Sequence, residues 1–285
     1  FWLADLYFSA TRDKKIYESK YLSAVRAALA VMEIEQHPEN SPYRHQRYGE
    51  GAHIGDTLIN GGRGGVCGYT GMVRTAYRPS DDAAAFGFNI PENMLAAAVL
   101  AKIAKGCRIL GEEETARRAE KLGAEIRKGI ESYGTICENG ETFYAYEVDG
   151  LGNALFMDDA NVPSLLAAPF MGFCPAEDPL YCVTRGKVLS YRNPFYFEGA
   201  AANGVGSPHT PDGYIWHIGL CVQLLTSRSE EEVTRLFGVL RDTDAGTLQM
   251  HEGFDCNDPG KYTRPWFAWA NSMLALCITE RGEQL

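Results

Sequence analysis

The sequence predicts an all-α fold, and three observations support this prediction. Apolar residues recur at helical spacing in several long segments, and strand signals are scarce. Long loops rich in Gly, Pro and aromatic residues separate the helices in pairs, with no linker-like change in composition. We therefore expect a single domain over residues 1–285, in which helix pairs pack together and bring their loops to one end.

The first long helix is expected over residues 13–37, because apolar residues keep helical spacing there and Pro38 ends the run. A segment from Glu39 to Arg78, rich in Gly and Tyr, follows this helix. A loop of this length usually has a function or contains short elements of its own.

An αα-hairpin is predicted next, from helices at 91–110 and 112–133. Pro91 suits a first-turn position, and Gly111 separates the two helices. Weak alternation over 142–148 then predicts a short strand.

The remaining helices are expected in the C-terminal half. Asp158 or Asp159 can cap a helix running towards Phe170. Ser229, followed by Glu232, forms a capping box at the start of another helix. The later predicted helices span residues 178–189, 213–225, 229–240 and 265–279.

The composition narrows the class of partner. The chain is 45% hydrophobic and 22% charged, as is typical of a soluble globular protein, and no apolar run nears the ~18 residues of a membrane span. With 27 Lys and Arg against 37 Asp and Glu, the net charge is −10 and no basic cluster stands out. We therefore expect no nucleic-acid or membrane partner, and a neutral ligand fits better.

The eight cysteines are spread along the chain without a C-x-x-C pair, mostly in apolar settings. This pattern favours buried thiols over a disulfide framework or a zinc site. Unpaired thiols slightly favour a soluble cytoplasmic location, although the sequence leaves the compartment open.

Several familiar chemistries are disfavoured by their missing residues. The Gly-rich segment 60–71 has no G-K-[ST], and Cys67 stands where a dinucleotide fingerprint needs glycine. The segment starting at His251 resembles a zinc-peptidase motif, but its second ligand position holds Asp255. No G-x-S-x-G elbow is present, and the histidines form no metal-spaced pair, so we expect neither a metal nor a cofactor.

What the loops do contain is acidic residues beside aromatic residues and arginines. Four such clusters occupy residues 77–82, 157–161, 207–216 and 251–269. Aromatic rings stack on the apolar faces of a sugar, and Asp, Asn and Arg bind its hydroxyls. Hydrolysis of a glycosidic bond also needs two carboxyl groups, one protonated and one ionised.

Each cluster also has a purely structural interpretation. The Asp pairs 81–82 and 158–159 precede predicted helices and are equally suited to cap them. Glu252 fits a solvated loop acid, while Trp266 and Trp269 fit the core face of the last helix. No spacing rule joins the clusters into one site.

Five segments along the chain resemble the metal-independent α-mannosidases of glycoside hydrolase family 125. They are YRPSDDA, NIPENM, MDDANVPSLLAAPF, NPFYFEGAAANGVGSPHTPDGYIW and MHEGFDCNDPGKYTRPWFAWANS. The resemblance implies an (α/α)6 barrel and exo-acting, inverting hydrolysis of α-1,6-linked mannose without a metal. The substrates it implies are mannan or N-glycan fragments.

The resemblance also implies the catalytic pair. Glu252 matches the general base, and the general acid is Asp81 or Asp82, with a slight preference for Asp81. Burial beside its sister Asp would raise the pKa of the acid, and the two carboxyls would lie roughly 6.5–9.5 Å apart. The motifs further suggest sugar contacts from Arg78, Asp159, Asn161, His209, Tyr214, Trp216, His251, Arg264 and Trp266.

The resemblance further implies that the chain lacks the first helices of the barrel. Phe1 already lies inside an apolar rhythm, and six helix pairs need more helices than we predict. We therefore expect the C-terminal two-thirds of such an enzyme, whose own activity stays open. The alternatives are a non-catalytic mannan-binding fragment and an (α/α)6 glycosidase of another specificity.

Overall fold

A computed structural model describes residues 1–18, 20–46 and 57–284. The chain divides into two compact units. The first unit comprises residues 1–76, 83–135 and 147–154, and the second comprises 77–82, 136–146 and 155–285. The prediction of a single catalytic domain stays a prediction.

The first unit consists mainly of helices. They are α1 (Trp2–Thr11), the 3-10 helix η1 (Lys14–Tyr17), α2 (Tyr21–Glu35), the single turn α3 (Ile59–Gly62), α4 (Ile90–Ile109) and α5 (Glu113–Tyr133). Strands β1 (Phe88–Asn89) and β4 (Glu147–Val148) pair antiparallel within this unit.

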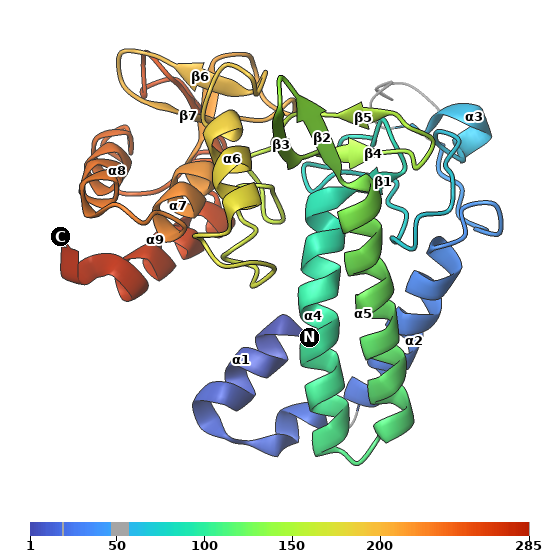
Figure 1. Cartoon of the computed structure of the whole chain (residues 1–285). Helices are drawn as coiled ribbons and strands as arrows, with labels where there is room; N and C mark the ends of the chain where they lie inside the picture. The colour runs from blue at the N-terminus through green and yellow to red at the C-terminus, as the bar shows by residue number, and fades with distance from the viewer. Residues whose placement is uncertain (19, 47–56, 285) are drawn as a thin grey trace. The chain divides into compact units, whose positions relative to one another are not determined.

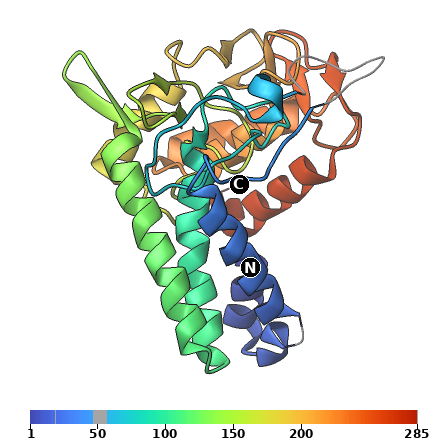
Figure 2. The ribbon, with the colours of Figure 1, turned by 90° about the vertical axis from the view of Figure 1, so that its right-hand side faces the viewer.

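Helices α4 and α5 form the predicted αα-hairpin and run side by side in both views (Figures 1 and 2). Asn89 caps α4 by accepting a hydrogen bond from the Glu92 amide at 2.9 Å, and Pro91 lies in the first turn. Small and branched side chains such as Leu100 and Ile126 are buried along the hairpin. These two helices were therefore predicted almost residue by residue.

The helix predicted over 13–37 is shorter than expected. Residues 14–17 form the separate helix η1, whose N-terminus is capped by the Asp13 carboxylate, and α2 begins only at Tyr21. Of the long segment between Glu39 and Arg78, residues 47–56 lie outside the described part of the chain.

The second unit holds the remaining helices. They are α6 (Pro179–Val188), α7 (His217–Leu225), α8 (Glu230–Asp242), α9 (Ala268–Arg281) and the 3-10 helix η3 (Gly282–Gln284). Ser229 caps α8 as predicted, because its hydroxyl accepts a hydrogen bond from the Glu232 amide. Buried apolar side chains of α7, including Leu220 and Val222, form a core with α8 and α9.

Short strands are more frequent than the sequence indicated. They are β2 (Thr135–Glu138), β3 (Glu141–Tyr144), β5 (Ala154–Leu155), β6 (Tyr196–Glu198), β7 (Asn203–Val205), β8 (Tyr214–Trp216), β9 (Gly253–Asp255) and β10 (Tyr262–Thr263). At two to four residues each, they are too short to produce a clear alternating pattern. The fold is mostly helical, but it is not purely α.

The helix predicted after Asp158 is absent, and the segment towards Phe170 forms turns. The Asp158 carboxylate accepts hydrogen bonds from the amides of Leu165 and Leu166, seven and eight residues further on. A helix cap would bond two or three residues on, so this side chain closes a wider loop. The sequence identified a backbone-binding Asp but assigned it the wrong structure.

Two other predicted helices begin late. Residues 214–216 pair with β9, so α7 starts at His217 rather than at Gly213. Residues 265–267 precede α9, which starts at Ala268.

None of the helices in the described part of the chain is both long and apolar enough to span a bilayer. Cys107, Cys221, Cys256 and Cys277 are buried as expected. Cys137 and Cys182 are exposed instead. The prediction of buried thiols is therefore confirmed for only some of the cysteines.

Candidate active site

A small cavity of about 110 Å³ in the second unit draws its wall from all four sequence clusters. Its lining residues are Pro79, Ser80, Asp81, Asn161, His209, Trp216, Glu252, Arg264, Phe267 and Trp269. Six of these ten had been predicted as site residues. The fold therefore supplies the proximity that no spacing rule in the sequence provided.

A three-stranded sheet in the order β10–β9–β8 positions Glu252. Glu252 directly precedes β9, whose first residue, Gly253, pairs with Trp216 on one side and Thr263 on the other. The Glu252 amide also donates to the Thr263 carbonyl at 3.3 Å. The backbone of Glu252, just before the central strand β9, is thus bonded to the edge strand β10.

The same register places Arg264, which follows Thr263, opposite Glu252. Its Nε lies 3.0 Å from Glu252 Oε1, and the Glu252 side chain is only 7% exposed. Arg264 has φ of 47°, in the left-handed region, and its guanidinium lies over the Phe267 ring at 5.4 Å. The charged partner gives this nearly buried carboxylate an ion pair that fixes its orientation.

The acidic pair 81–82 lies on a tight turn. The Asp81 amide donates to the Arg78 carbonyl at 2.9 Å, and the Arg78 amide donates to the Asp82 carbonyl at 2.8 Å. Asp81 has φ of 70°, a left-handed conformation that Asp tolerates better than most residues. Asn89 caps the next helix, so the capping interpretation of this pair is wrong.

The two carboxyls of this turn differ in their surroundings. The Asp82 carboxylate accepts a hydrogen bond from the Ser80 hydroxyl at 2.8 Å and lies 3.7 Å from His209 Nδ1. Asp81 is exposed, lines the cavity, and makes no side-chain hydrogen bond or ion pair with any residue that the structure describes. Asp81 is therefore free to exchange a proton with a ligand in the cavity.

A buried polar pair lies behind this wall. Asn161 Nδ2 donates to Asp159 Oδ1 at 3.2 Å, and both side chains are almost completely buried. Burial raises the pKa of Asp159, although nearby hydroxyls of Ser80 and Ser207 lower it in part. Within the described part of the chain, Asp159 Oδ2 and Asn161 Oδ1 have no hydrogen-bond partner, and of the two residues only Asn161 lines the cavity.

The neighbouring Asp158 has a different role. Its two carboxylate oxygens are used by backbone amides, it is fully buried, and burial raises its pKa to about 7. It shapes the loop that carries Asp159 and Asn161 and is not part of the cavity wall.

Aromatic rings form another part of the wall. Trp216 is buried, donates from Nε1 to Thr210 Oγ1 at 2.8 Å, and meets Phe267 edge to face at 6.3 Å. Trp269, which the sequence analysis weighed as a core residue, is 40% exposed and lines the cavity. Sequence reasoning missed Phe267 and Trp269 as site residues, although both stand in the RPWFAW run beside Arg264.

Five predicted sugar-binding residues are not part of the cavity wall, and one of them is the buried Asp159. Trp266 is 65% exposed, and Tyr214 lies in β8. The Arg78 guanidinium lies over the Tyr146 ring at 5.7 Å. His251 is completely buried, which prevents it from contacting a sugar in this conformation.

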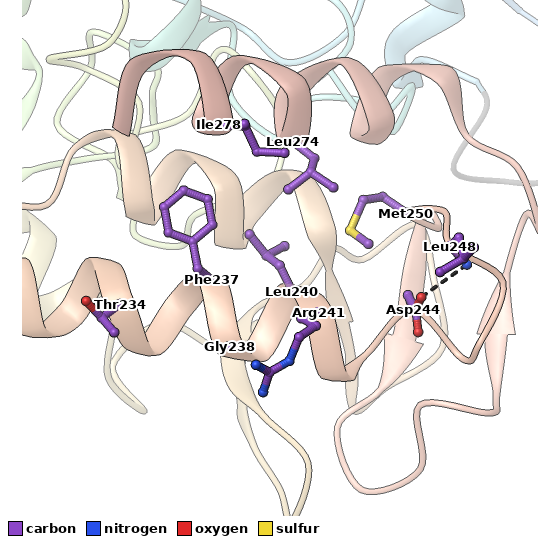
Figure 3. Close-up of a pocket in the computed structure, with 10 residues that line it drawn as sticks. All are labelled: Thr234, Phe237, Gly238, Leu240, Arg241, Asp244, Leu248, Met250, Leu274 and Ile278. Atoms are coloured by element: carbon purple, nitrogen blue, oxygen red, sulfur yellow. Dashed lines mark hydrogen bonds between the residues drawn. The ribbon is translucent and has the colours of Figure 1, made fainter. Parts of the chain in front are cut away.

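A larger cavity of about 440 Å³ lies between α8 and α9 (Figure 3). Its wall is mostly apolar and includes Phe237, Leu240, Met250 and Leu274. The carboxylate of Asp244 is already used by the Leu248 amide, as the dashed line shows. Its other polar lining residues are Thr234 and Arg241, and Arg241 pairs with Asp242, so this cavity offers a sugar few unused polar groups.

The described residues contain no group of three metal-ligating side chains.

A small cavity lined by two acids, an arginine and several aromatic rings, on a mostly helical scaffold, is characteristic of carbohydrate-active proteins. Residues 1–279 match the family of metal-independent α-mannosidases, glycoside hydrolase family 125. The chain belongs to this family.

Two relatives and one more distant structure are similar to this chain in sequence or structure. It is 37% identical over 294 residues to the meiotically up-regulated gene 157 protein of Schizosaccharomyces pombe, covering 99% of this chain and 57% of that protein. It is 40% identical, with a TM-score of 0.95, to a metal-independent α-mannosidase structure from Streptococcus pneumoniae, a non-productive complex with α-1,6-mannobiose. That match covers 98% of this chain and 66% of the streptococcal chain, so this chain spans about three-fifths to two-thirds of these relatives.

A bacterial glucoamylase complexed with acarbose shares 14% identity and a TM-score of 0.55, over 70% of this chain and 34% of the glucoamylase. At this level of identity the likeness concerns the fold alone. It relates the helical scaffold to a second class of glycosidase.

Proposed function

We propose that this chain forms the catalytic part of an exo-acting, inverting α-1,6-mannosidase built on an (α/α)6 barrel. One observation carries the proposal: Glu252 and Asp81 line the same small cavity, together with residues suited to bind a sugar. The family membership and the α-1,6-mannobiose in the streptococcal structure support mannose as the substrate.

In the proposed mechanism, Asp81 protonates the glycosidic oxygen while Glu252 takes a proton from the attacking water. Arg264 orients the Glu252 carboxylate through their 3.0 Å contact. Asn161 lines the cavity and binds a sugar hydroxyl, Asp159 holds the Asn161 amide from behind, and Trp269 offers a partly exposed ring for the sugar face. The water oxygen forms a bond to the anomeric carbon on the face opposite the leaving group as the glycosidic C–O bond breaks, so β-mannose and the protonated alcohol leave. Solvent then takes the proton from Glu252 and returns one to Asp81, and this mechanism needs no metal.

The test is turnover of α-1,6-mannobiose in the presence of EDTA, followed by NMR of the anomeric protons. We expect β-mannose as the first product and full activity with the chelator. First appearance of α-mannose would contradict inversion, and loss of activity with EDTA would contradict the metal-free mechanism. The α-1,2 and α-1,3 mannobioses and the α-1,6 glucobiose serve as controls for linkage and sugar, and binding without turnover would favour a mannan-binding fragment.

A further inference from the structure

His217 lies directly behind the proposed general base. It is the first residue of α7, it is completely buried, and it follows Trp216, which pairs with Gly253. Its Nδ1 lies 3.1 Å from the amide nitrogen of His251 and 3.0 Å from the carbonyl oxygen of the same residue. The imidazole therefore contacts the backbone one residue before Glu252.

The surrounding hydrogen bonds fix the tautomer of His217. Its Nε2 lies 3.2 Å from Thr243 Oγ1, and the Thr243 hydroxyl donates to the Val239 carbonyl at 2.8 Å. Because that hydroxyl proton is used, Thr243 Oγ1 accepts from Nε2–H of His217. Nδ1 then carries no proton and accepts the hydrogen bond of the His251 amide.

The neutral form of His217 is strongly favoured. Its pKa is lowered to about 4, mainly by burial; the hydrogen bond to the His251 backbone opposes this shift, the charge of the His251 ring adds to it, and Asp244 opposes it in part. The N-terminus of α7 also disfavours a positive charge at this position. The ring lies 4.7 Å from the Phe254 ring, an apolar neighbour. A protonated Nδ1 would exchange the His251 amide for the His251 carbonyl, 3.0 Å away, as its hydrogen-bond partner.

His251 is held on its other side by the segment that carries Arg264. Its Nδ1 donates to the Pro265 carbonyl at 2.8 Å, and its ring stacks on Tyr262 at 3.8 Å. The residue before Glu252 is thus fixed both to the start of α7 and to the segment that contacts the Glu252 carboxylate.

We propose that His217 is a positioning residue for Glu252, holding the His251 amide so that the base stays aimed into the cavity. This inference rests on the proposed function, because it assigns Glu252 the role of base. Because His217 is completely buried, it acts on Glu252 through the backbone.

The test compares His217→Asn with His217→Leu, two side chains of nearly the same shape. Asn can place its Oδ1 near the position of Nδ1 and accept from the His251 amide, whereas Leu cannot. We expect His217→Leu to lower kcat on α-1,6-mannobiose up to about 100-fold with KM little changed, and His217→Asn to restore most of it. The loss should persist on a 2,4-dinitrophenyl α-mannoside, because an activated leaving group replaces the acid but not the base.

Equal kcat for the two variants, or recovery of His217→Leu on the activated substrate, would overturn the inference.

Hydrogen exchange of the His251 amide gives a readout without turnover. The exchange should be slow in the wild type and in His217→Asn, and fast in His217→Leu. Slow exchange in all three would also overturn it. An inactive wild type would instead contradict the mannosidase proposal. Should His217→Leu not fold, Thr243→Val removes the acceptor of Nε2–H and should also lower kcat; an unchanged kcat would count against the inference.

Discussion

The two acids of the proposed catalytic pair are held in very different ways. Glu252 is nearly buried, its backbone is bonded to a neighbouring strand, and its carboxylate contacts Arg264. Asp81 stands exposed on a tight turn in a left-handed conformation, without a side-chain partner among the described residues. A general base must stay ionised and aimed at one water, whereas a general acid must lose and regain a proton in every cycle. We infer that the surroundings of Glu252 hold the base in one orientation, whereas those of Asp81 leave the acid open to solvent and ligand.

The sharpest test of this contrast is Glu252→Gln. The amide cannot accept the proton of the attacking water, so we expect kcat on α-1,6-mannobiose to fall about 10³- to 10⁴-fold, as for loss of a general base. Steady-state kinetics measures the fall. Glu231→Gln on the exposed face of α8 is the matched control and should leave kcat unchanged.

The acid side can be tested by comparing Asp81→Asn with Asp82→Asn. If Asp81 is the acid, its variant should lose about 10²- to 10³-fold in kcat on mannobiose and recover on a 2,4-dinitrophenyl α-mannoside. Asp82→Asn should lose less, since its carboxylate is already bonded to Ser80. The opposite order of losses would assign the acid to Asp82.

A smaller effect is expected from Arg264→Met. It leaves the nearly buried Glu252 carboxylate without its cation, so we expect about a tenfold loss in kcat/KM, in line with a charge-assisted hydrogen bond. Arg241→Met is the control, because that arginine is exposed and pairs with the adjacent Asp242. Equal kinetics for the two variants would mean that the contact has no catalytic role.

The sequence predicted regular elements well and irregular ones poorly. The α4–α5 hairpin was anticipated because Pro91, Gly111 and the apolar spacing are all local signals. The segment after Asp158 was not, because its carboxylate bonds to amides seven and eight residues away. The helix and turn preferences of single residues do not encode a hydrogen bond between residues seven or eight positions apart.

The candidate site shows the same division. Glu252 and Asp81 were found through the family resemblance, and their common cavity depends on contacts that no spacing rule encodes. His251 was expected to bind sugar from the motif that it shares with Glu252. The structure instead buries it against Tyr262, where its ring nitrogens bond to the protein. Glu252, the next residue, lines the cavity, so the shared motif did not report which of the two side chains reaches the site.

The smallest predicted effect concerns stability and separates Asp158 from its neighbours in the site. The carboxylate of Asp158 accepts two backbone hydrogen bonds, so Asp158→Asn should lower the free energy of unfolding by about 1–3 kcal/mol at pH 5. The folded-state pKa of about 7 lies above the ordinary value of 3.8, so the folded protein binds this proton more tightly than the unfolded chain. The stability that Asp158 contributes is therefore lost as the pH rises from about 4 to about 7, and the variant lacks this loss. The difference between wild type and Asp158→Asn, measured by urea unfolding, should shrink from pH 5 to pH 8. A difference that grows over this range would mean that Asp158 is ionised in the folded protein throughout.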